Sequence, residues 1–155
     1  MIKNNQTKIV IDCETSGLDP HKHQIIEICI ATLDDKNEII DIWSQRVEFD
    51  YKRANSTALK INGYENDRDL WANAMPQLEL ALELRNRIKG KTIIGHNVKF
   101  DMEFIVECWR VSLISKPKFD YKYIDTVVLA HYHLDFLGMS LSLDTIRKFF
   151  GWSLD

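Results

Sequence analysis

The sequence lacks the long apolar runs, paired cysteines and one-sided charge that mark several classes of protein. No stretch approaches the roughly 18 apolar residues of a membrane span, so we expect no membrane partner. The three cysteines form no CxxC pair, which argues against zinc or a disulfide framework and suits a reducing, cytoplasmic compartment. With 20 Lys and Arg against 23 Asp and Glu, the net charge of −3 gives no overall positive field. Any nucleic-acid binding must therefore be local.

The 155 residues fit one globular α/β domain, because their hydrophobic share of 45% and charged share of 28% are close to globular averages. Apolar patterning and turn residues predict strands at 8–14, 24–33, 38–49, 91–95 and 121–124. They also predict helices at 67–89, 98–112, 126–134 and 140–150. The first three strands should form an antiparallel meander, and the later alternation implies a mixed sheet covered by helices.

Two acids at the end of the first predicted strand are the first candidate site. Strand side chains alternate, so Asp12 and Glu14 share one face while Ile11 and Cys13 share the other. Like charges held this close favour a hard divalent cation with oxygen ligands. The simpler alternative is a solvated strand end with two surface acids.

A third acid follows the fourth predicted strand, in the segment GHNVKFD at residues 95–101. Asp101 falls in the first turns of a helix, where negative charge is favoured, and it can lean over the same edge of the sheet. The alternative is an ordinary first-turn Asp, with Asn97 as the helix cap.

Five ordered segments resemble the motifs of one known family. They are IVIDCETSGLDP (9–20), HQIIEI (23–28), IIGHNVKFDMEFI (93–105), YIDTVVLA (123–130) and SLSLDTIRKFFG (140–151). Together they resemble the DnaQ-like, proofreading branch of the DEDD superfamily of 3′-to-5′ exonucleases. The resemblance implies an RNase H-like fold, a five-stranded mixed sheet with three antiparallel strands first.

The resemblance also implies a chemistry. In that family, carboxylates hold two Mg²⁺ or Mn²⁺ ions, one generating hydroxide and the other stabilising the leaving 3′ oxygen. The resemblance implies that Asp12, Glu14 and Asp101 are the catalytic and metal-binding residues of this sequence. The ions would supply positive charge at the scissile phosphate, so the net negative charge of the chain does not argue against a nucleic-acid substrate. The implied substrate is a single-stranded DNA or RNA 3′ end, and the implied partner is a polymerase.

Further residues match family positions around the substrate. The backbone at Thr15 would meet the terminal 3′ hydroxyl, Leu18 would wedge against the terminal base, and Asn97 would lie near the scissile nucleotide. Leu18 is equally compatible with the core. His96 and Asp125 are expected to support the site from behind, His96 as a packed residue and Asp125 as the cap of the following helix.

The third motif of the family supplies a general-base His with a fourth acid as HxxxxD, or a Tyr as YxxxD. No HxxxxD follows Asp101 in this sequence, because Phe136 and Gly138 stand where His131 and His133 would need an acid. Tyr121 fits YxxxD with residue 125, but this pair aligns better with a non-catalytic strand-to-helix element of the family.

The missing His and acid would come on one further helix shortly after Gly151, whereas the sequence stops at Asp155. We therefore expect residues 1–155 to be one exonuclease-like domain without its C-terminal helix, through truncation. The alternatives are a second subunit that completes the site, or a catalytically incomplete DnaQ-like module that binds nucleic acid or a polymerase. An RNase H-like endonuclease using the same carboxylates is a further alternative.

Overall fold

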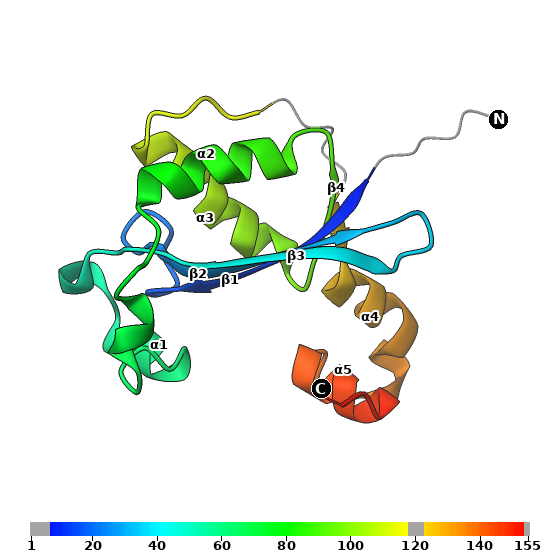
Figure 1. Cartoon of the computed structure of the whole chain (residues 1–155). Coiled ribbons are helices and arrows are strands. Elements are labelled where there is room, and N and C mark those ends of the chain that lie inside the picture. Colours follow the sequence, from blue (N-terminus) through cyan, green and yellow to red (C-terminus); the bar gives the residue numbers. More distant parts are fainter. Residues whose placement is uncertain (1–6, 118–122, 154–155) are drawn as a thin grey trace.

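The computed structural model describes residues 7–117 and 123–153, which form a mixed five-stranded sheet flanked by helices (Figure 1). The strands are β1 (Lys8–Thr15), β2 (Ile25–Leu33), β3 (Ile39–Arg46), β4 (Thr92–Gly95) and β5 (Tyr123–Asp125). Their spatial order is β3-β2-β1-β4-β5, with β1, β2 and β3 antiparallel and the β1–β4 and β4–β5 pairs parallel. The prediction of three antiparallel strands followed by parallel ones is confirmed.

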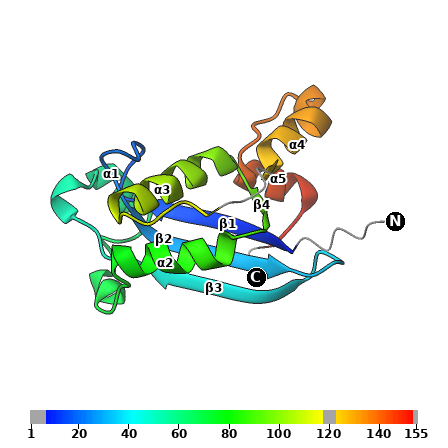
Figure 2. The same ribbon diagram turned by 90° about the horizontal axis from the view of Figure 1, so that it is seen from above.

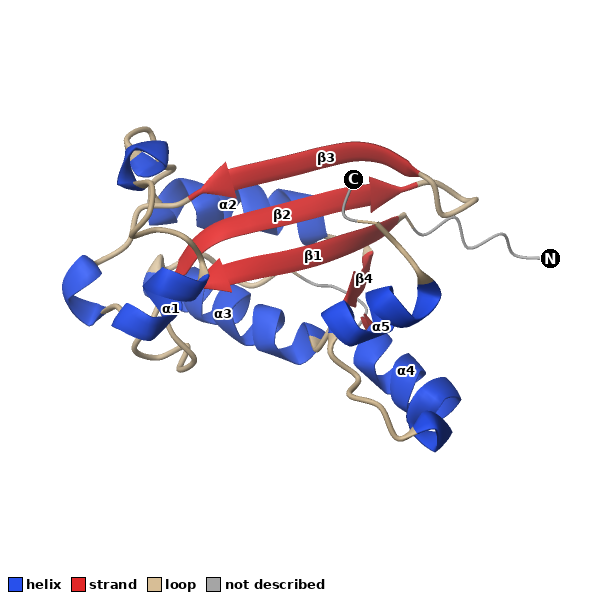
Figure 3. Ribbon diagram, turned by 90° about the horizontal axis from the view of Figure 1, so that it is seen from below, coloured by secondary structure: helices blue, strands red, loops and turns tan. Residues whose placement is uncertain are grey.

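The helices divide between the two faces of the sheet. They are α1 (Ser56–Ile61), α2 (Gln77–Ile88), α3 (Val98–Val111), α4 (Thr126–Leu134) and α5 (Leu143–Phe150). The α2 and α3 helices lie side by side over one face of β1 to β3 (Figure 2). On the other face, α1 and α5 stand at opposite ends of these strands (Figure 3). None of the helices in the described ranges has the length and apolar content needed to cross a membrane.

The hydrophobic core lies between the sheet and the α2–α3 pair. The predicted stripe of α2 is buried, namely Leu80, Ala81, Leu84 and Ile88, and so are the predicted α3 residues Ile105, Cys108 and Trp109. Ile9 and Ile11 meet them from β1. The indole Nε1 of Trp109 donates to the carbonyl of Ala81 over 2.9 Å, which fixes one helix against the other. One face of β1 is thereby committed to the core, and its other face remains for polar side chains.

The prediction of one helix over 67–89 is wrong in its first half. Residues 68–71 form a short 3₁₀ helix, and α2 begins only at Gln77. Met75 precedes Pro76, and a residue in that position is pushed from helical to extended backbone. The amide of Met75 instead donates to the carbonyl of Arg46 over 2.8 Å, which ties the segment to the end of β3.

The other boundaries shift by a few residues. The strand predicted over 38–49 ends at Arg46, and the last helix begins at Leu143, where the Ser142 side chain accepts from Thr145 N–H. Residues 121–122 of the last predicted strand lie outside the described residues, and the remainder forms β5. The short α1 helix was not predicted.

Candidate active site

Asp12 and Glu14 project from the exposed face of β1. Along this strand Ile11 and Cys13 are buried while the two acids are exposed, so the predicted alternation is confirmed. They lie beside an open cavity of about 330 Å³, lined by Asp12, Glu14, Glu27, Ile28, Cys29, Ile61 and Asn62. The two acids therefore border a space on the face of the sheet opposite the α2–α3 layer.

Glu27 is a fourth acid that the sequence reasoning missed. It lies on β2 directly opposite Glu14 in the antiparallel register. The pKa of Glu14 is raised by partial burial first, then by the charges of Asp12 and Glu27. The alternation in EICI, residues 27–30, would have revealed Glu27, because Ile28 and Ile30 lie in the core and Glu27 falls on the opposite face. Arg46 on β3 partly offsets this charge, with its Nε 3.9 Å from Glu27 Oε2.

Asp101 reaches β1 from the first turn of α3 and is only 4% exposed. The parallel ladder between β1 and β4 ends at Val10 and Ile94, so the amide of Cys13 extends beyond it. Asp101 Oδ1 accepts from that amide over 2.9 Å. Burial, followed by the charge of Asp12, raises the pKa of Asp101 from 3.8 to about 6, although the Cys13 hydrogen bond opposes the rise. The predicted approach of Asp101 to the first strand is thus observed.

These acids fit a divalent cation in their chemistry, because they are hard oxygen ligands whose mutual repulsion a cation would relieve. Within residues 7–117 and 123–153, however, no group of three His, Cys, Asp or Glu side chains is arranged so that it could hold a metal ion. Asp101 is committed to the Cys13 amide, and it does not line the cavity beside Asp12 and Glu14. The three predicted ligands can therefore share a cation only if their carboxylates move closer together. Their metal-binding role stays a prediction.

The turn after β1 carries two of the predicted substrate contacts. Thr15 is buried, and its hydroxyl donates to the carbonyl of Gly17 over 2.7 Å. The Thr15 carbonyl accepts from Asn62 Nδ2 over 2.8 Å, so α1 and its cap residue are fastened to the end of β1. Leu18 is 83% exposed, which rules out the alternative of a core residue. Its contact with substrate stays a prediction.

Asn97, His96 and Asp125 meet where β4 and β5 end. Asp125 caps α4 as predicted, since its Oδ1 accepts from Val127 N–H over 2.9 Å. The same oxygen accepts from the amide of Asn97 over 3.0 Å. Asn97 occupies the cap position of α3 in a left-handed conformation, with φ of 65°, and its side chain makes no capping bond. Asn97 is therefore the cap residue by position, as the alternative predicted, but its side chain does not make the bond typical of such a cap. His96 Nδ1 lies 2.9 Å from Thr126 Oγ1.

Of the candidates for a fourth corner, the two histidines lie away from this group. Tyr121 lies outside the described residues. His131 pairs with Asp135 one turn further along the chain, at 3.3 Å, and both side chains are exposed. His133 lines a separate, mostly apolar groove between α4 and α5, together with His96.

The geometry agrees with the sequence comparison. The RNase_T family, described as an exonuclease family, matches residues 9–152. The chain belongs to this exonuclease family. DNA polymerase III subunit epsilon of Treponema pallidum is 32% identical over 119 residues, which is 77% of this chain and 53% of that protein. The PolC-type DNA polymerase III of Thermotoga petrophila is 28% identical over 151 residues, 95% of this chain and 10% of that polymerase. The chain thus spans about half of one curated relative and a tenth of the other, and the DnaQ-like resemblance is confirmed.

The fold has close counterparts among solved structures. Product-bound exonuclease I superimposes with a TM-score of 0.83 at 17% identity, over 98% of this chain and 40% of that one. Exonuclease I from E. coli in complex with a dT13 oligonucleotide gives 0.82 at 19% identity, over 97% and 37% of the two chains. At such identities the likeness concerns the fold, and it confirms the predicted RNase H-like arrangement of this family member.

Proposed function

We propose that this exonuclease-family protein is a metal-dependent 3′-to-5′ exonuclease that removes nucleotides from single-stranded 3′ ends, in proofreading or end trimming. The observation that carries the proposal is the pair formed by Asp101 and Asp12. A carboxylate is buried beside β1, and the charge of its neighbour helps to raise its pKa to about 6. Burying one carboxylate against another is costly unless something compensates the charge. A divalent cation would do so.

Asp12, Glu14 and Asp101 are the residues that would hold Mg²⁺ or Mn²⁺, in a site for two ions. When bound, the ions would provide a hydroxide nucleophile and offset the charge that develops on the leaving oxygen. Glu27 lies next to this set, and its ion pair with Arg46 partly neutralises it. We therefore expect Glu27 to adjust the charge of the site while the other three acids act as ligands.

Two exposed aliphatic side chains flank the acids and support a single-stranded substrate. Leu18, just after Glu14, is 83% exposed, and Ile61 on the cavity wall is 79% exposed. Apolar side chains next to charged ones gain by covering the face of an unpaired base. The backbone at Thr15 would meet the terminal 3′ hydroxyl, and Asn97, exposed at the start of α3, would lie near the scissile nucleotide.

The names of the relatives are consistent with this reading. One relative is a subunit of DNA polymerase III, and one solved exonuclease I holds a dT13 oligonucleotide. For this chain we propose a single-stranded DNA or RNA 3′ end as the substrate and a polymerase as a partner.

The second candidate function is a DnaQ-like module that binds nucleic acid or a polymerase without cleaving. Two observations favour it. No HxxxxD follows Asp101 in this sequence, and no three acid, His or Cys side chains in the described ranges form a closed metal site. Loss of a general base alone commonly costs about 10²- to 10⁴-fold in rate.

Cleavage of end-labelled single strands in Mn²⁺ separates the candidates. Products that shorten stepwise from a free 3′ end support the exonuclease, and a circular strand of the same sequence should then survive. Internal fragments, or a cut circle, would indicate an endonuclease. Binding of the linear strand without cleavage would indicate the non-catalytic module.

Variants of the acids test the residue roles. Asp12→Ala and Asp101→Asn should each abolish cleavage while the circular dichroism spectrum stays that of the parent protein. Asn at residue 101 can still accept from the Cys13 amide, so folding is preserved. Glu103→Gln is a matched control on the same helix, because Glu103 is half exposed and its ion pair in the described part of the chain is with Lys99 on the surface, at 3.7 Å. Unchanged turnover in either acid variant would rule out the metal assignment.

A further inference from the structure

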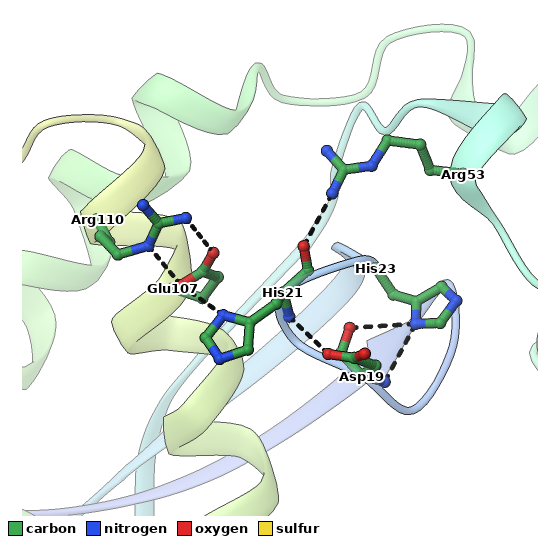
Figure 4. A network of polar contacts seen from close by, with 6 residues as sticks. All are labelled: Asp19, His21, His23, Arg53, Glu107 and Arg110. Carbon is green, nitrogen blue, oxygen red and sulfur yellow. Dashed lines mark hydrogen bonds and ion pairs between the residues drawn. The ribbon is translucent and has the colours of Figure 1, made fainter.

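The loop between β1 and β2, residues 16–24, is closed by its own hydrogen bonds, and we call it the Leu18 loop. At its base, Ser16 N–H donates to the carbonyl of Gln24 over 2.8 Å, and Gln24 N–H donates to Ser16 Oγ over 2.9 Å. At its tip, Asp19 N–H donates to His23 Nδ1 over 3.1 Å (Figure 4). The loop therefore holds its own shape, but these bonds do not fix where it sits on the protein.

Contacts from two other elements hold the outer side of this loop (Figure 4). His21 Nδ1 lies 3.4 Å from Glu107 Oε2 on α3. Arg110 binds both oxygens of Glu107, at 2.7 and 2.6 Å. From the other side, Arg53 Nη2 donates to the carbonyl of His21 over 3.1 Å. We call these four residues the His21 clamp.

Glu107 is the anchor of the clamp. Its side chain is only 10% exposed, whereas that of His21 is 77% exposed. A carboxylate this deeply buried needs charged or hydrogen-bonding partners, and its paired arginine holds it in one orientation. Arg110 first, and His21 next, lower the pKa of Glu107, so it stays ionised and keeps its charge toward the loop. Glu107 therefore presents a fixed negative charge to the exposed His21 imidazole.

The space beneath the loop makes this contact important. A cavity of about 140 Å³ separates the loop from α3 and the end of β2, and its walls include Gln24, Gln77, Phe104 and the clamp residues His21 and Glu107. The side chains around this cavity leave it unfilled, so close packing across the cavity does not position the loop. The base of the loop is held by Asn55 N–H, which donates to the Ser16 carbonyl over 2.7 Å, and by Asp50 N–H, which donates to Gln24 Oε1 over 2.7 Å. The polar contacts of the clamp hold its outer part, because regions with few packed contacts open most easily.

The clamp also connects the loop to the candidate active site through one helix. α3 carries Asp101 in its first turn and Glu107 further along, so a single rigid element sets both positions. Leu18 is 83% exposed on the clamped loop. The distance between Leu18 and Asp101 therefore depends on β1 at one end of the loop and on the clamp at the other.

We propose that the His21 clamp is a positioning device, which holds the Leu18 loop against α3 and so sets the affinity of the site for a free 3′ end. The free 3′ end as substrate comes from the proposed function. The contact between His21 and Glu107 comes from the structure alone. Its residues act through Leu18 and touch neither the acids nor the substrate.

The test uses the whole chain with His21→Ala and Glu107→Gln. Lys22→Ala is the matched control in the loop, since Lys22 pairs within the loop itself, with Asp19 at 3.2 Å. Glu103→Gln is the control on α3. Hydrogen exchange of the loop amides measures how firmly the clamp holds the loop, independently of any enzymatic activity. Affinity is measured in Mn²⁺ for a fluorescent single-stranded DNA with phosphorothioate linkages at its 3′ end, and for the circle made by ligating the ends of the same strand.

Each clamp variant should speed exchange of the loop amides about two- to five-fold, the order of effect of losing one partly exposed polar contact. The preference for the linear strand over the circle should fall by a similar factor, because only the linear strand offers an end to Leu18. A merely structural role would weaken both DNAs equally. Both controls should keep the parent protein's preference for the linear strand, and Glu103→Gln should also keep its exchange rates.

Unchanged exchange in both clamp variants would overturn the clamp itself. Faster exchange with an unchanged preference for the linear strand would overturn its role in positioning Leu18. If the parent protein bound neither DNA, the proposed function would fail, while the exchange result would still decide whether His21 and Glu107 hold the loop.

Discussion

Replacing Asp101 by Asn should stabilise the protein in the absence of divalent metal. Burial and the charge of Asp12 raise the pKa of Asp101 from 3.8 to about 6, so its ionised form opposes folding. The penalty is absent below the unfolded value of 3.8, grows as the pH rises to about 6, and is constant above that. Asp101→Asn removes the charge but keeps an acceptor for the Cys13 amide.

The size of the effect follows from the gap of about 2 pKa units. At about 1.4 kcal/mol per unit, the ionised carboxylate costs about 3 kcal/mol at most. Part of this gain is lost because the new amide group brings hydrogens that find no partner in a buried place. We therefore expect Asp101→Asn to raise the free energy of unfolding by about 1–3 kcal/mol at neutral pH, and by much less near pH 4.

Urea unfolding in a chelator, at neutral pH and near pH 4, measures the difference. Glu103→Gln should change stability by less than about 0.5 kcal/mol at both pH values, because Glu103 is half exposed. Adding Mn²⁺ should then stabilise the parent protein, by about 2.7 kcal/mol at a hundredfold excess over Kd, and the variant much less. A variant as stable as the parent at neutral pH, or less stable, would refute the reasoning about Asp101.

Three smaller changes test other parts of the site. Asp125→Ala removes the acceptor for Val127 N–H and should cost about 1–2 kcal/mol in urea unfolding, with faster amide exchange at the start of α4; an unchanged midpoint would contradict the cap. Gly17→Ala should cost about 1–3 kcal/mol, because its Cβ would stand 2.4 Å from the His23 ring, and His23→Ala should relieve part of that loss. Leu18→Ala should leave thermal stability within error while weakening binding of single-stranded DNA, and a large loss of stability would show that Leu18 packs.

Local patterns predicted the parts of the fold that depend on them. Alternation placed Asp12 and Glu14 on one face of β1, and helical spacing found the buried stripe that includes Leu84. The α1 helix was not predicted because it is short and Leu59 is its one buried residue, so its sequence shows no apolar periodicity. Its start was readable, since Asn55 caps the helix through its side chain.

Contacts between distant segments could not be predicted in the same way. The Asp101 bond to Cys13 joins residues 88 positions apart, and it exists because β4 stops short of that part of β1. Ile61 and Asn62 reach the acids only because the segment after β3 folds back to the end of β1. The length of a neighbouring strand and the path of a loop are set by tertiary packing, which leaves no local trace in the sequence.

The central place of β1 in the sheet has a consequence for how local unfolding and proteolysis affect the site. β1 is bonded to β2 on one side and to β4 on the other, whereas β3 and β5 are the outer strands. Fluctuations and proteolytic nicks begin at outer strands and chain ends. Asp12 and Glu14 lie just past the residues of β1 that pair with β4, and there β2 on one side and the Asp101 bond to Cys13 on the other hold the strand. Damage at the periphery can accumulate while these acids remain aligned.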